Sequence, residues 1–334
     1  MTALVGSRGA ADATRMRVPE FFIVGAPKCG TTSLYRMLRQ HPRIFMPDLK
    51  EPRFLASDAR GLLSTLPERA NIAYPETLED YLALFAEARE HQLAGEATTS
   101  YLWSRTAAAH IAELAPDARI IAILREPASL IRSLHLQLLG GRIETESNLR
   151  KALSLEAARR EGRHIPPALR WPALLQYSEH VRYMEQLRRY HDVFAPEQIL
   201  VLIYDDFRAD NAAVLRRVLR FLGLPDDVPI DLQKANVTTQ TVRSWWLKRV
   251  LRSLTIGQGP IPRAAKPVIK AISTRGMRRT AMRTIDRNVI NAPVPPPDEQ
   301  LMAELRLRFL PEVVALSEYL DRDLVALWGY DDLG

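Results

Sequence analysis

The sequence has a single cysteine and no long apolar run. Cys29 is alone among 334 residues, which excludes an intramolecular disulfide and a paired-cysteine metal cluster. This scarcity is typical of a reducing compartment, so we expect a cytoplasmic, soluble protein. No apolar run is long enough to cross a bilayer, and the N-terminus lacks the apolar core of a signal peptide. We expect residues 1–18 to form a disordered tail before a single domain over residues 19–334.

Acidic residues are almost missing from one segment. Between Arg243 and Arg287 there are 12 Lys and Arg and one acid, Asp286, a balance of +11. The whole chain carries +7, which leaves −4 for the remainder. A basic block can attract an anionic ligand or a lipid headgroup surface, or it can simply be a solvated face. We expect residues 243–290 to form a basic, mainly helical cap or lid within the domain.

Alternating apolar runs and helical periods indicate the fold class. Strands are predicted at residues 21–24, 119–124 and 199–203, and helices at residues 33–40, 106–114, 179–191 and 211–222. This order predicts an α/β fold of three layers, with a central parallel sheet flanked by helices. A helical period resumes after Pro297, and Pro311 predicts a break between two helices. Ligands of such sheets bind at the C-terminal ends of the strands.

The strongest local pattern is FFIVGAPKCGTTSLYRML, an apolar strand followed by a glycine-bounded loop and an amphipathic helix. The spacing from Gly25 to Gly30 is that of a phosphate loop, in which backbone N–H groups and a helix N-terminus converge on an anion. The alternative is an ordinary strand-to-helix turn capped by Thr or Ser. Lys28 inside the turn favours anion binding, since a small or apolar residue would serve packing better.

The loop differs from that of nucleoside triphosphatases. Those proteins have a lysine directly after the second glycine, where this chain has Thr31. The strand at residues 119–124 is followed by Arg125, where a triphosphatase has a metal-binding aspartate. The site is therefore predicted to be P-loop-like and nucleotide-binding, with no metal required.

Together these segments resemble the bacterial sulfotransferases that use 3′-phosphoadenosine-5′-phosphosulfate (PAPS) and are related to the heparan-sulfate type, over about residues 20–330. GAPKCGTTSL resembles the family's 5′-phosphosulfate loop, and LREPASLIRSLHLQLL resembles its 3′-phosphate motif. The cofactor-binding residues that this resemblance implies are Ala26, Pro27, Lys28, Cys29, Gly30, Thr31, Thr32, Ser33, Arg125 and Ser133. Two cationic sites suit a donor that carries phosphate at both ends of its ribose.

The resemblance implies an EC 2.8.2-type transferase. It would move a sulfuryl group by in-line displacement to a hydroxyl or amine of a carbohydrate, glycolipid or small natural product. HPRIFMPDLKEPRFLASD is similar to the segment that carries the family's general base, which implies Glu51 as base, with Lys28 at the leaving oxygen. Lys50 and Arg53 flank Glu51, so a purely structural ion pair is the alternative. His41 is a second candidate base, but its place after the helix predicts packing.

The acceptor side is implied by weaker similarities. GEATTSYLWS resembles a block that has Glu-Lys-Thr-Pro in heparan-type enzymes, and here Ala97 replaces the lysine and Thr99 the proline. This departure counts against a second catalytic cation there and against a polysaccharide acceptor. The substrate-binding residues that the resemblance implies are Glu96, Tyr101, Tyr177 and His180, with Ser100 beside them and Tyr204 at the end of the third strand.

The basic cap adds one implied donor contact. Arg275 resembles the basic loop that closes over the 3′-phosphate, and Arg278 and Arg279 are equal candidates. The stretch from Trp246 to Leu254 places apolar residues on one helical face, which fits either a lid at a membrane surface or, as we favour, a helix packed on the sheet.

Two other functions compete. A P-loop kinase or triphosphatase would require magnesium. A basic nucleic-acid-binding module would require a basic helix interleaved with base-stacking aromatics, which the chain lacks. We therefore expect no nucleic-acid partner. The sequence leaves the acceptor and the oligomeric state open.

Overall fold

The computed structural model describes residues 17–59, 73–167, 169, 171–232, 240–242, 291–293 and 295–331. The chain divides into two compact units, one formed by Met1–Asn236 with Glu299–Gly334 and the other by Val237–Asp298. The second unit spans the predicted basic cap. Its described elements are the antiparallel strands β6 (Gln240–Val242) and β7 (Asn291–Pro293). The helical character expected for residues 243–290 lies outside the described residues, and the single-domain assignment stays a prediction.

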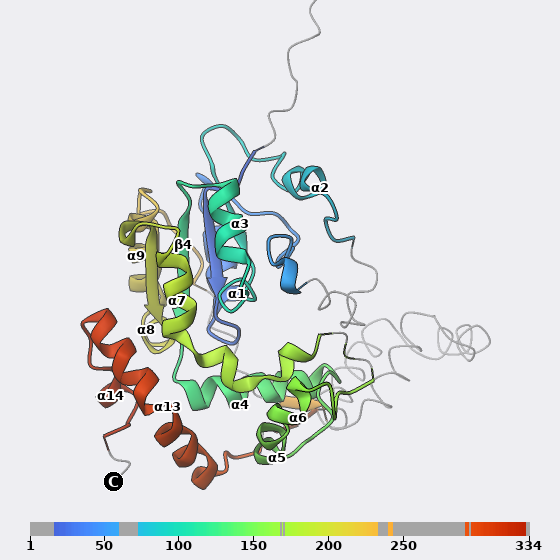
Figure 1. Cartoon of the computed structure of the whole chain (residues 1–334). Coiled ribbons are helices and arrows are strands. Elements are labelled where there is room, and N and C mark those ends of the chain that lie inside the picture. The colour runs from blue at the N-terminus through green and yellow to red at the C-terminus, as the bar shows by residue number, and fades with distance from the viewer. Residues whose placement is uncertain are drawn as a thin grey trace, which may run out of the picture. The chain divides into compact units, whose positions relative to one another are not determined.

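A parallel five-stranded sheet of order β2-β3-β1-β4-β5 forms the centre of the first unit (Figure 1). The strands are β1 (Phe21–Gly25), β2 (Ile44–Phe45), β3 (Leu93–Ala97), β4 (Arg119–Leu124) and β5 (Ile199–Ile203). In register, Phe21 lies opposite Gly95 on β3 and Arg119 on β4. The three predicted strands are thus confirmed. Sequence patterns missed β2, which has two residues, and β3, whose sequence LAGEA contains no β-branched or aromatic side chain.

Helices surround this sheet. The α-helices of the first unit are α1 (Thr31–Leu38), α2 (Leu78–Ala83), α3 (Ala107–Leu114), α4 (Pro127–Gly140), α5 (Leu149–Ser154), α6 (Glu156–Arg160), α7 (Tyr183–His191), α8 (Tyr204–Ala209), α9 (Asn211–Phe221), α13 (Glu299–Leu320) and α14 (Leu324–Leu327). Short 3₁₀ helices are η3 (Pro172–Leu175), η4 (Tyr177–Val181) and η5 (Pro196–Gln198). The helix predicted over residues 179–191 is in fact η4 followed by α7, because Arg182 (φ −81°, ψ 63°) leaves the helical region between them.

The strand order determines which helices share a face. The chain moves from β1 to the far edge at β2 through α1, and it moves in the opposite direction from β3 to β4 through α3. Since parallel crossovers are right-handed, α1 and α3 lie on opposite faces of the sheet. α9 contacts α1 and α7 contacts α3, which gives two helical layers. The direction of the crossovers reverses around β1, so the crevice for a ligand is expected at the C-terminal end of that strand.

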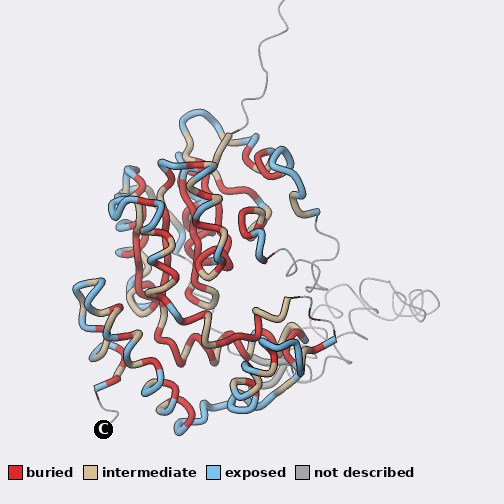
Figure 2. The backbone as a smooth tube through the Cα atoms, viewed as in Figure 1, coloured by how far each residue is buried: buried red, intermediate tan, exposed pale blue. Residues whose placement is uncertain are grey.

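Every residue of β1 is buried, because both faces of the sheet are covered (Figure 2). An ideal Cβ on Gly95 would lie 2.0 Å from the Phe21 ring, so the glycine makes room for this aromatic side chain in the neighbouring strand. α4, α5 and α6 lie beyond the C-terminal ends of the strands, at the lower end of Figure 1.

The C-terminal helix corrects one prediction. Pro311 does not separate two helices: α13 runs without interruption from Glu299 to Leu320. Its buried residues form one continuous stripe that passes Pro311 on both sides: Leu301, Met302, Leu305, Phe309, Val313 and Leu316. The carbonyl that the proline leaves without a helical partner belongs to Leu307, which is exposed and accessible to water. Burial of the stripe against α4 and α7 therefore outweighs the loss of one hydrogen bond.

The bounds of the N-terminal tail stay a prediction, and one residue within the predicted tail has hydrogen bonds to the first unit. Arg17 donates hydrogen bonds to the carbonyl oxygens of Arg89, at 2.7 Å, and of Gln92, so this residue already belongs to the folded unit. Within the described ranges, no helix combines the length and the apolar character that a membrane span requires.

Candidate active site

The loop after β1 has the backbone of an anion-binding turn. Gly30 adopts φ 82° and precedes α1 directly, and Lys28 also has a left-handed φ of 64°. An ideal Cβ on Gly30 would lie 2.8 Å from the Phe207 ring, so both conformation and space require glycine. No side chain caps the N-terminus of α1, and its first turn contains no acid. The N–H groups and the helix dipole are therefore suited to an anion.

Arg125 lies over this loop from the end of the adjacent strand. Its Nη1 donates a hydrogen bond to the Lys28 carbonyl oxygen at 3.3 Å. Its guanidinium carbon lies 4.9 Å from the centre of the Tyr204 ring, and its own carbonyl accepts a 2.7 Å hydrogen bond from Tyr183 Oη. Burial, and then the positive charge of Arg125, lower the pKa of Lys28. Two cations are thus held together at the C-terminal ends of β1 and β4.

The other predicted loop residues differ in exposure. Ala26 is buried, and its N–H donates to the Ile123 carbonyl at 2.7 Å. The Cys29 thiol is also buried and donates to the Pro27 carbonyl at 3.4 Å, and burial raises its pKa to about 12. The thiol therefore faces the interior, and Cys29 can serve a ligand through its backbone only. Pro27 is half-buried, Thr32 is exposed, and the side chains of Thr31 and Ser33 are buried.

α4 carries the second predicted donor motif. Its N-terminus is capped by Glu126, whose carboxylate accepts hydrogen bonds from Ala128 N at 2.9 Å and Ser129 N at 2.6 Å. Ser133 lies two turns into the helix and is half-buried. Sequence reasoning missed its neighbour Arg132, whose pKa is lowered by burial and then by the charge of Arg125. The available signal was its place in the segment LREPASLIRSLHLQLL, directly before Ser133.

Glu51 lies at the C-terminal edge of the same sheet. Its N–H donates to the Ala97 carbonyl, at the end of β3, at 3.0 Å. Its carboxylate accepts hydrogen bonds from Lys50 Nζ at 3.0 Å, from Thr99 Oγ1 at 3.4 Å and from Arg53 Nη2. Glu51 and Arg53 both have positive φ, 62° and 59°, a strained conformation typical of functional sites. The ion pairs predicted as an alternative role do form, and they hold the carboxylate in place.

Arg53 is the site residue that the sequence analysis undervalued. Its side chain is 8% exposed and one of its nitrogens pairs with Glu51. Its Nε and Nη1 have no hydrogen-bond partner among the described residues. Buried donors without a partner are costly, so an anionic group beside Glu51 would stabilise this arginine. The residues present thus fit an anionic substrate.

Glu96 and Tyr101 lie beneath the segment that carries Glu51. The Glu96 carboxylate is fully buried and accepts hydrogen bonds from Tyr81 Oη at 2.6 Å, Thr98 Oγ1 at 2.5 Å and Tyr101 Oη at 3.0 Å. Burial raises its pKa to about 7. Tyr101 Oη in turn accepts from Leu55 N at 3.1 Å. These two predicted acceptor residues therefore support the Glu51 segment from below.

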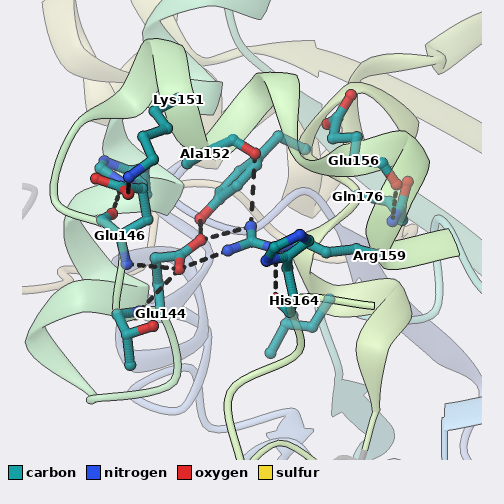
Figure 3. A network of polar contacts seen from close by, with 12 residues as sticks. Glu144, Glu146, Lys151, Ala152, Glu156, Arg159, His164 and Gln176 are labelled. Carbon is teal, nitrogen blue, oxygen red and sulfur yellow. Dashed lines mark hydrogen bonds and ion pairs between the residues drawn. The ribbon is translucent and has the colours of Figure 1, made fainter. Parts of the chain in front are cut away.

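Tyr177 and His180 lie in a different part of the fold, on η4. Tyr177 is fully buried and its hydroxyl donates to Glu144 at 2.9 Å, within the polar network of Figure 3. His180 is buried too; its Nε2 lies 3.3 Å from the Leu174 carbonyl, and burial lowers its pKa to about 4. Its ring centre lies 4.3 Å from that of Trp103. The structure brings neither side chain into contact with the loop after β1.

His41 has the packing role that its position predicts. It is buried, its Nε2 lies 3.1 Å from the Pro225 carbonyl, and its Nδ1 accepts from Arg43 N at 3.2 Å. Arg275, Arg278 and Arg279, the predicted contacts of the basic cap, lie outside the described residues. In the described part of the chain, no group of three or more His, Cys, Asp or Glu side chains is arranged to hold a metal ion.

Comparison with known proteins agrees with this geometry. The model of the sulfotransferase family matches residues 19–228. Carbohydrate sulfotransferase 15 of Mus musculus is 27% identical over 256 residues, which cover 62% of this chain and 44% of that protein. Heparan sulfate glucosamine 3-O-sulfotransferase 3A1 of Mus musculus is 28% identical over 213 residues, which cover 64% of this chain and 48% of that protein. The chain thus spans about half the length of these relatives.

A solved structure extends the similarity over nearly the whole chain. The sulfotransferase from Alicyclobacillus acidocaldarius superposes with a TM-score of 0.63 at 26% identity, covering 92% of this chain and 98% of that one. The predicted α/β architecture, a central parallel sheet flanked by helices, is therefore confirmed. The chain belongs to the sulfotransferase family.

Proposed function

We propose that this sulfotransferase takes its sulfuryl group from PAPS and transfers it to a hydroxyl or amine by in-line displacement. The observation that carries the proposal is the placement of two cationic residues together: Arg125, at the end of β4, donates a 3.3 Å hydrogen bond to the backbone carbonyl oxygen of Lys28, in the loop after β1. PAPS has phosphate groups on both sides of its ribose and needs two anion sites close together. The loop after β1 and the end of β4 supply them.

On the donor side, the backbone of residues 26–33 and the start of α1 would hold the 5′-phosphosulfate. Arg125 and Ser133 would bind the 3′-phosphate, with Arg132 as an additional cation beside them. Arg275 stays a predicted contact from the basic cap. Lys28 would donate a hydrogen bond from Nζ to the leaving oxygen, and its lowered pKa makes the ammonium a better donor.

On the acceptor side, Glu51 would accept the proton of the attacking group. The hydrogen bonds from Lys50 and Arg53 keep its carboxylate oriented. Arg53 has two further buried nitrogens that fit the charge of the group in transfer. The proposed base is thus held by the C-terminal end of β3, and the proposed leaving-group cation lies in the loop after the neighbouring strand β1.

For the acceptor, we favour a carbohydrate over a glycolipid or another natural product, because the names of the similar curated proteins specify carbohydrate and heparan sulfate. The cytoplasmic location, the bacterial origin and a membrane contact of the basic cap remain predictions.

The direct test is transfer of radioactive sulfate from PAPS in magnesium-free buffer. The acceptors are heparosan, unsulfated chondroitin and 4-nitrophenol, which represent two polysaccharides and a phenol. The proposal predicts labelled product with at least one of them and none when PAPS is replaced by ATP with magnesium as the donor of a labelled phosphate. Labelling from ATP alone would contradict it and favour a kinase.

A further inference from the structure

The first unit contains a cavity of about 750 Å³ that the proposed mechanism does not use. Its walls come from the loop after β3, from the 3₁₀ segment η3–η4 and from α7. Charged, amide and aromatic side chains line it together.

Two indole rings form the aromatic part of this wall. Trp103 and Trp171 are stacked with their ring centres 4.5 Å apart and an angle of 21° between the planes. Both side chains line the cavity and both are only half-buried. They offer a rigid aromatic surface that can cover an apolar ligand face with little loss of side-chain entropy.

The polar part of the wall supplies donors and acceptors together. Gln186 is 1% exposed, and its Oε1 has no partner within the described ranges, while its Nε2 donates to the Glu179 carbonyl at 2.8 Å. The buried Nε of Arg189 also has no partner there. Glu185 pairs with both Arg182, at 3.0 Å, and Arg189, at 3.1 Å. A ligand with both hydroxyl donors and hydroxyl acceptors would satisfy these groups.

The cavity begins beside the donor loop. Leu102 N donates to the Val24 carbonyl at 2.8 Å, and the Leu102 side chain occupies the space above Gly25, where an ideal Cβ would be only 2.5 Å away. Trp103 is the next residue along the chain. Arg189, which also lines the cavity, has its Nη2 3.4 Å from the backbone carbonyl oxygens of Leu102 and Trp103. A ligand on Trp103 would therefore lie next to the loop that carries Lys28.

A buried polar network holds the wall in place (Figure 3). Arg159 donates to the two Glu144 oxygens at 2.7 and 2.8 Å, and both side chains are almost fully buried. Gln176, which lines the cavity, donates to the Glu156 carbonyl at 3.0 Å and accepts from Arg160 Nη2 at 3.2 Å. The 3₁₀ segment is thus fixed to α6, and the binding surface is preorganised.

We infer that this cavity binds a sugar unit of the acceptor, stacked on the indole pair and hydrogen-bonded to Gln186 and Arg189. The inference rests on the proposed function and identifies its acceptor subsite. A pyranose has an apolar C–H face for the indoles and hydroxyls that both donate and accept, which matches each part of the wall. A wholly apolar ligand would leave the charged groups of the wall unpaired.

The experiment measures binding and transfer with three variants. The probes are heparosan and chondroitin tetrasaccharides, titrated by calorimetry against the wild type, Trp171→Ala and Trp171→Phe, with Trp328→Phe as control. Trp328 directly follows α14, and its Nε1 donates a hydrogen bond to Asp205 at 2.9 Å. We expect Trp171→Ala to weaken saccharide binding and raise KM about tenfold, with kcat unchanged. Trp171→Phe should recover most of the affinity, and Trp328→Phe should bind like the wild type.

Calorimetry with the desulfated donor, 3′-phosphoadenosine-5′-phosphate (PAP), separates the two proposals. Equal PAP affinity in all variants shows that each one is folded and that the donor site is intact. If Trp171→Ala binds the saccharides as tightly as the wild type, or if a PAP-binding wild type binds neither saccharide, the inference is wrong while the proposed function stands. A wild type that does not bind PAP contradicts the proposed function itself, and saccharide binding sensitive to Trp171 would then still support the subsite.

Discussion

The guanidinium of Arg125 donates a hydrogen bond to the carbonyl oxygen of Lys28 at 3.3 Å, so the end of β4 holds the middle of the loop that follows β1. The Tyr204 ring supports the guanidinium from one side. Burial is the main cause of the lowered pKa of Lys28, and the positive charge of Arg125 beside it lowers this pKa further. A ligand with several negative charges would relieve the repulsion, which is why this pair defines the donor site.

Gly30 should be intolerant of a side chain. Gly30→Ala places a residue with Cβ at φ 82°, and this atom would lie 2.8 Å from Phe207. We expect a loss of roughly 3 kcal/mol in the free energy of unfolding and no detectable PAP binding. Urea denaturation and calorimetry measure the two effects.

Gly162 is the matched control, with φ 84° and no atom within 4 Å of an ideal Cβ. Gly162→Ala should therefore lose only about 1 kcal/mol in the free energy of unfolding, which is the cost of an alanine at positive φ, and it should bind PAP as the wild type does. Equal effects of the two substitutions would mean that the contact with Phe207 has no importance for the loop.

Glu51→Gln should lower kcat by roughly 10²- to 10⁴-fold, as expected when a general base is removed. PAP affinity should stay within about twofold of the wild type, because Glu51 is not assigned a donor contact. Glu79→Gln, an acid in the first turn of α2, is the control and should retain full activity. A Glu51→Gln variant that remains active would assign the carboxylate to the ion pairs with Lys50 and Arg53 alone.

The buried Glu96 carboxyl predicts an unusual dependence of stability on pH. Burial raises its pKa to about 7, above the value of about 4.3 for an unfolded glutamate. The folded state therefore binds the proton more tightly, and this stabilisation is complete below pH 4.3 and is lost as the pH rises through 7.

Glu96→Gln removes this titration. Relative to the variant, the wild type should lose on the order of 3 kcal/mol of unfolding free energy between pH 4.5 and pH 7.5. Urea denaturation of both proteins across this range measures the difference. Parallel curves would show that the three hydroxyl donors around Glu96 keep it ionised throughout.

The sequence predicted the central strands and the donor loop because their signals are local. A buried apolar run such as residues 120–124 has few other structures available to it. The helix break at Pro311 was predicted wrongly because the residues that bury α13 lie on α4 and α7, far away in the sequence. Packing at long range cannot be read from a single proline.

The acceptor side was predictable only in part, for the same reason. The segment around Glu51 resembles a family motif, and in the structure the Glu51 N–H is hydrogen-bonded to Ala97, the last residue of β3. Glu96 and Tyr101 carry the same kind of resemblance, yet they are buried below the Glu51 segment. The stacking of Trp103 on Trp171 joins residues 68 positions apart, and no local pattern indicates such a pair.

The Arg159–Glu144 pair should be essential for stability, since breaking one partner of a buried ion pair leaves an unpaired charge. Arg159→Met should cost about 4 kcal/mol in the free energy of unfolding. Lys151→Ala, which breaks the exposed ion pair with Glu146, should leave the urea midpoint unchanged. If Arg159→Met were as stable as Lys151→Ala, the network of Figure 3 would not be what holds η3 and η4.

The most direct test of the donor site is calorimetric titration with PAP in magnesium-free buffer. The wild type is compared with Arg125→Ala, Lys28→Ala and a control variant, Arg220→Ala. The control alters an exposed ion pair with Asp226. We expect the wild type and Arg220→Ala to bind PAP, and Arg125→Ala to lose affinity by about 100-fold or more. A wild type that ignores PAP, or an Arg125→Ala variant that binds it equally well, would contradict the assignment of the donor site.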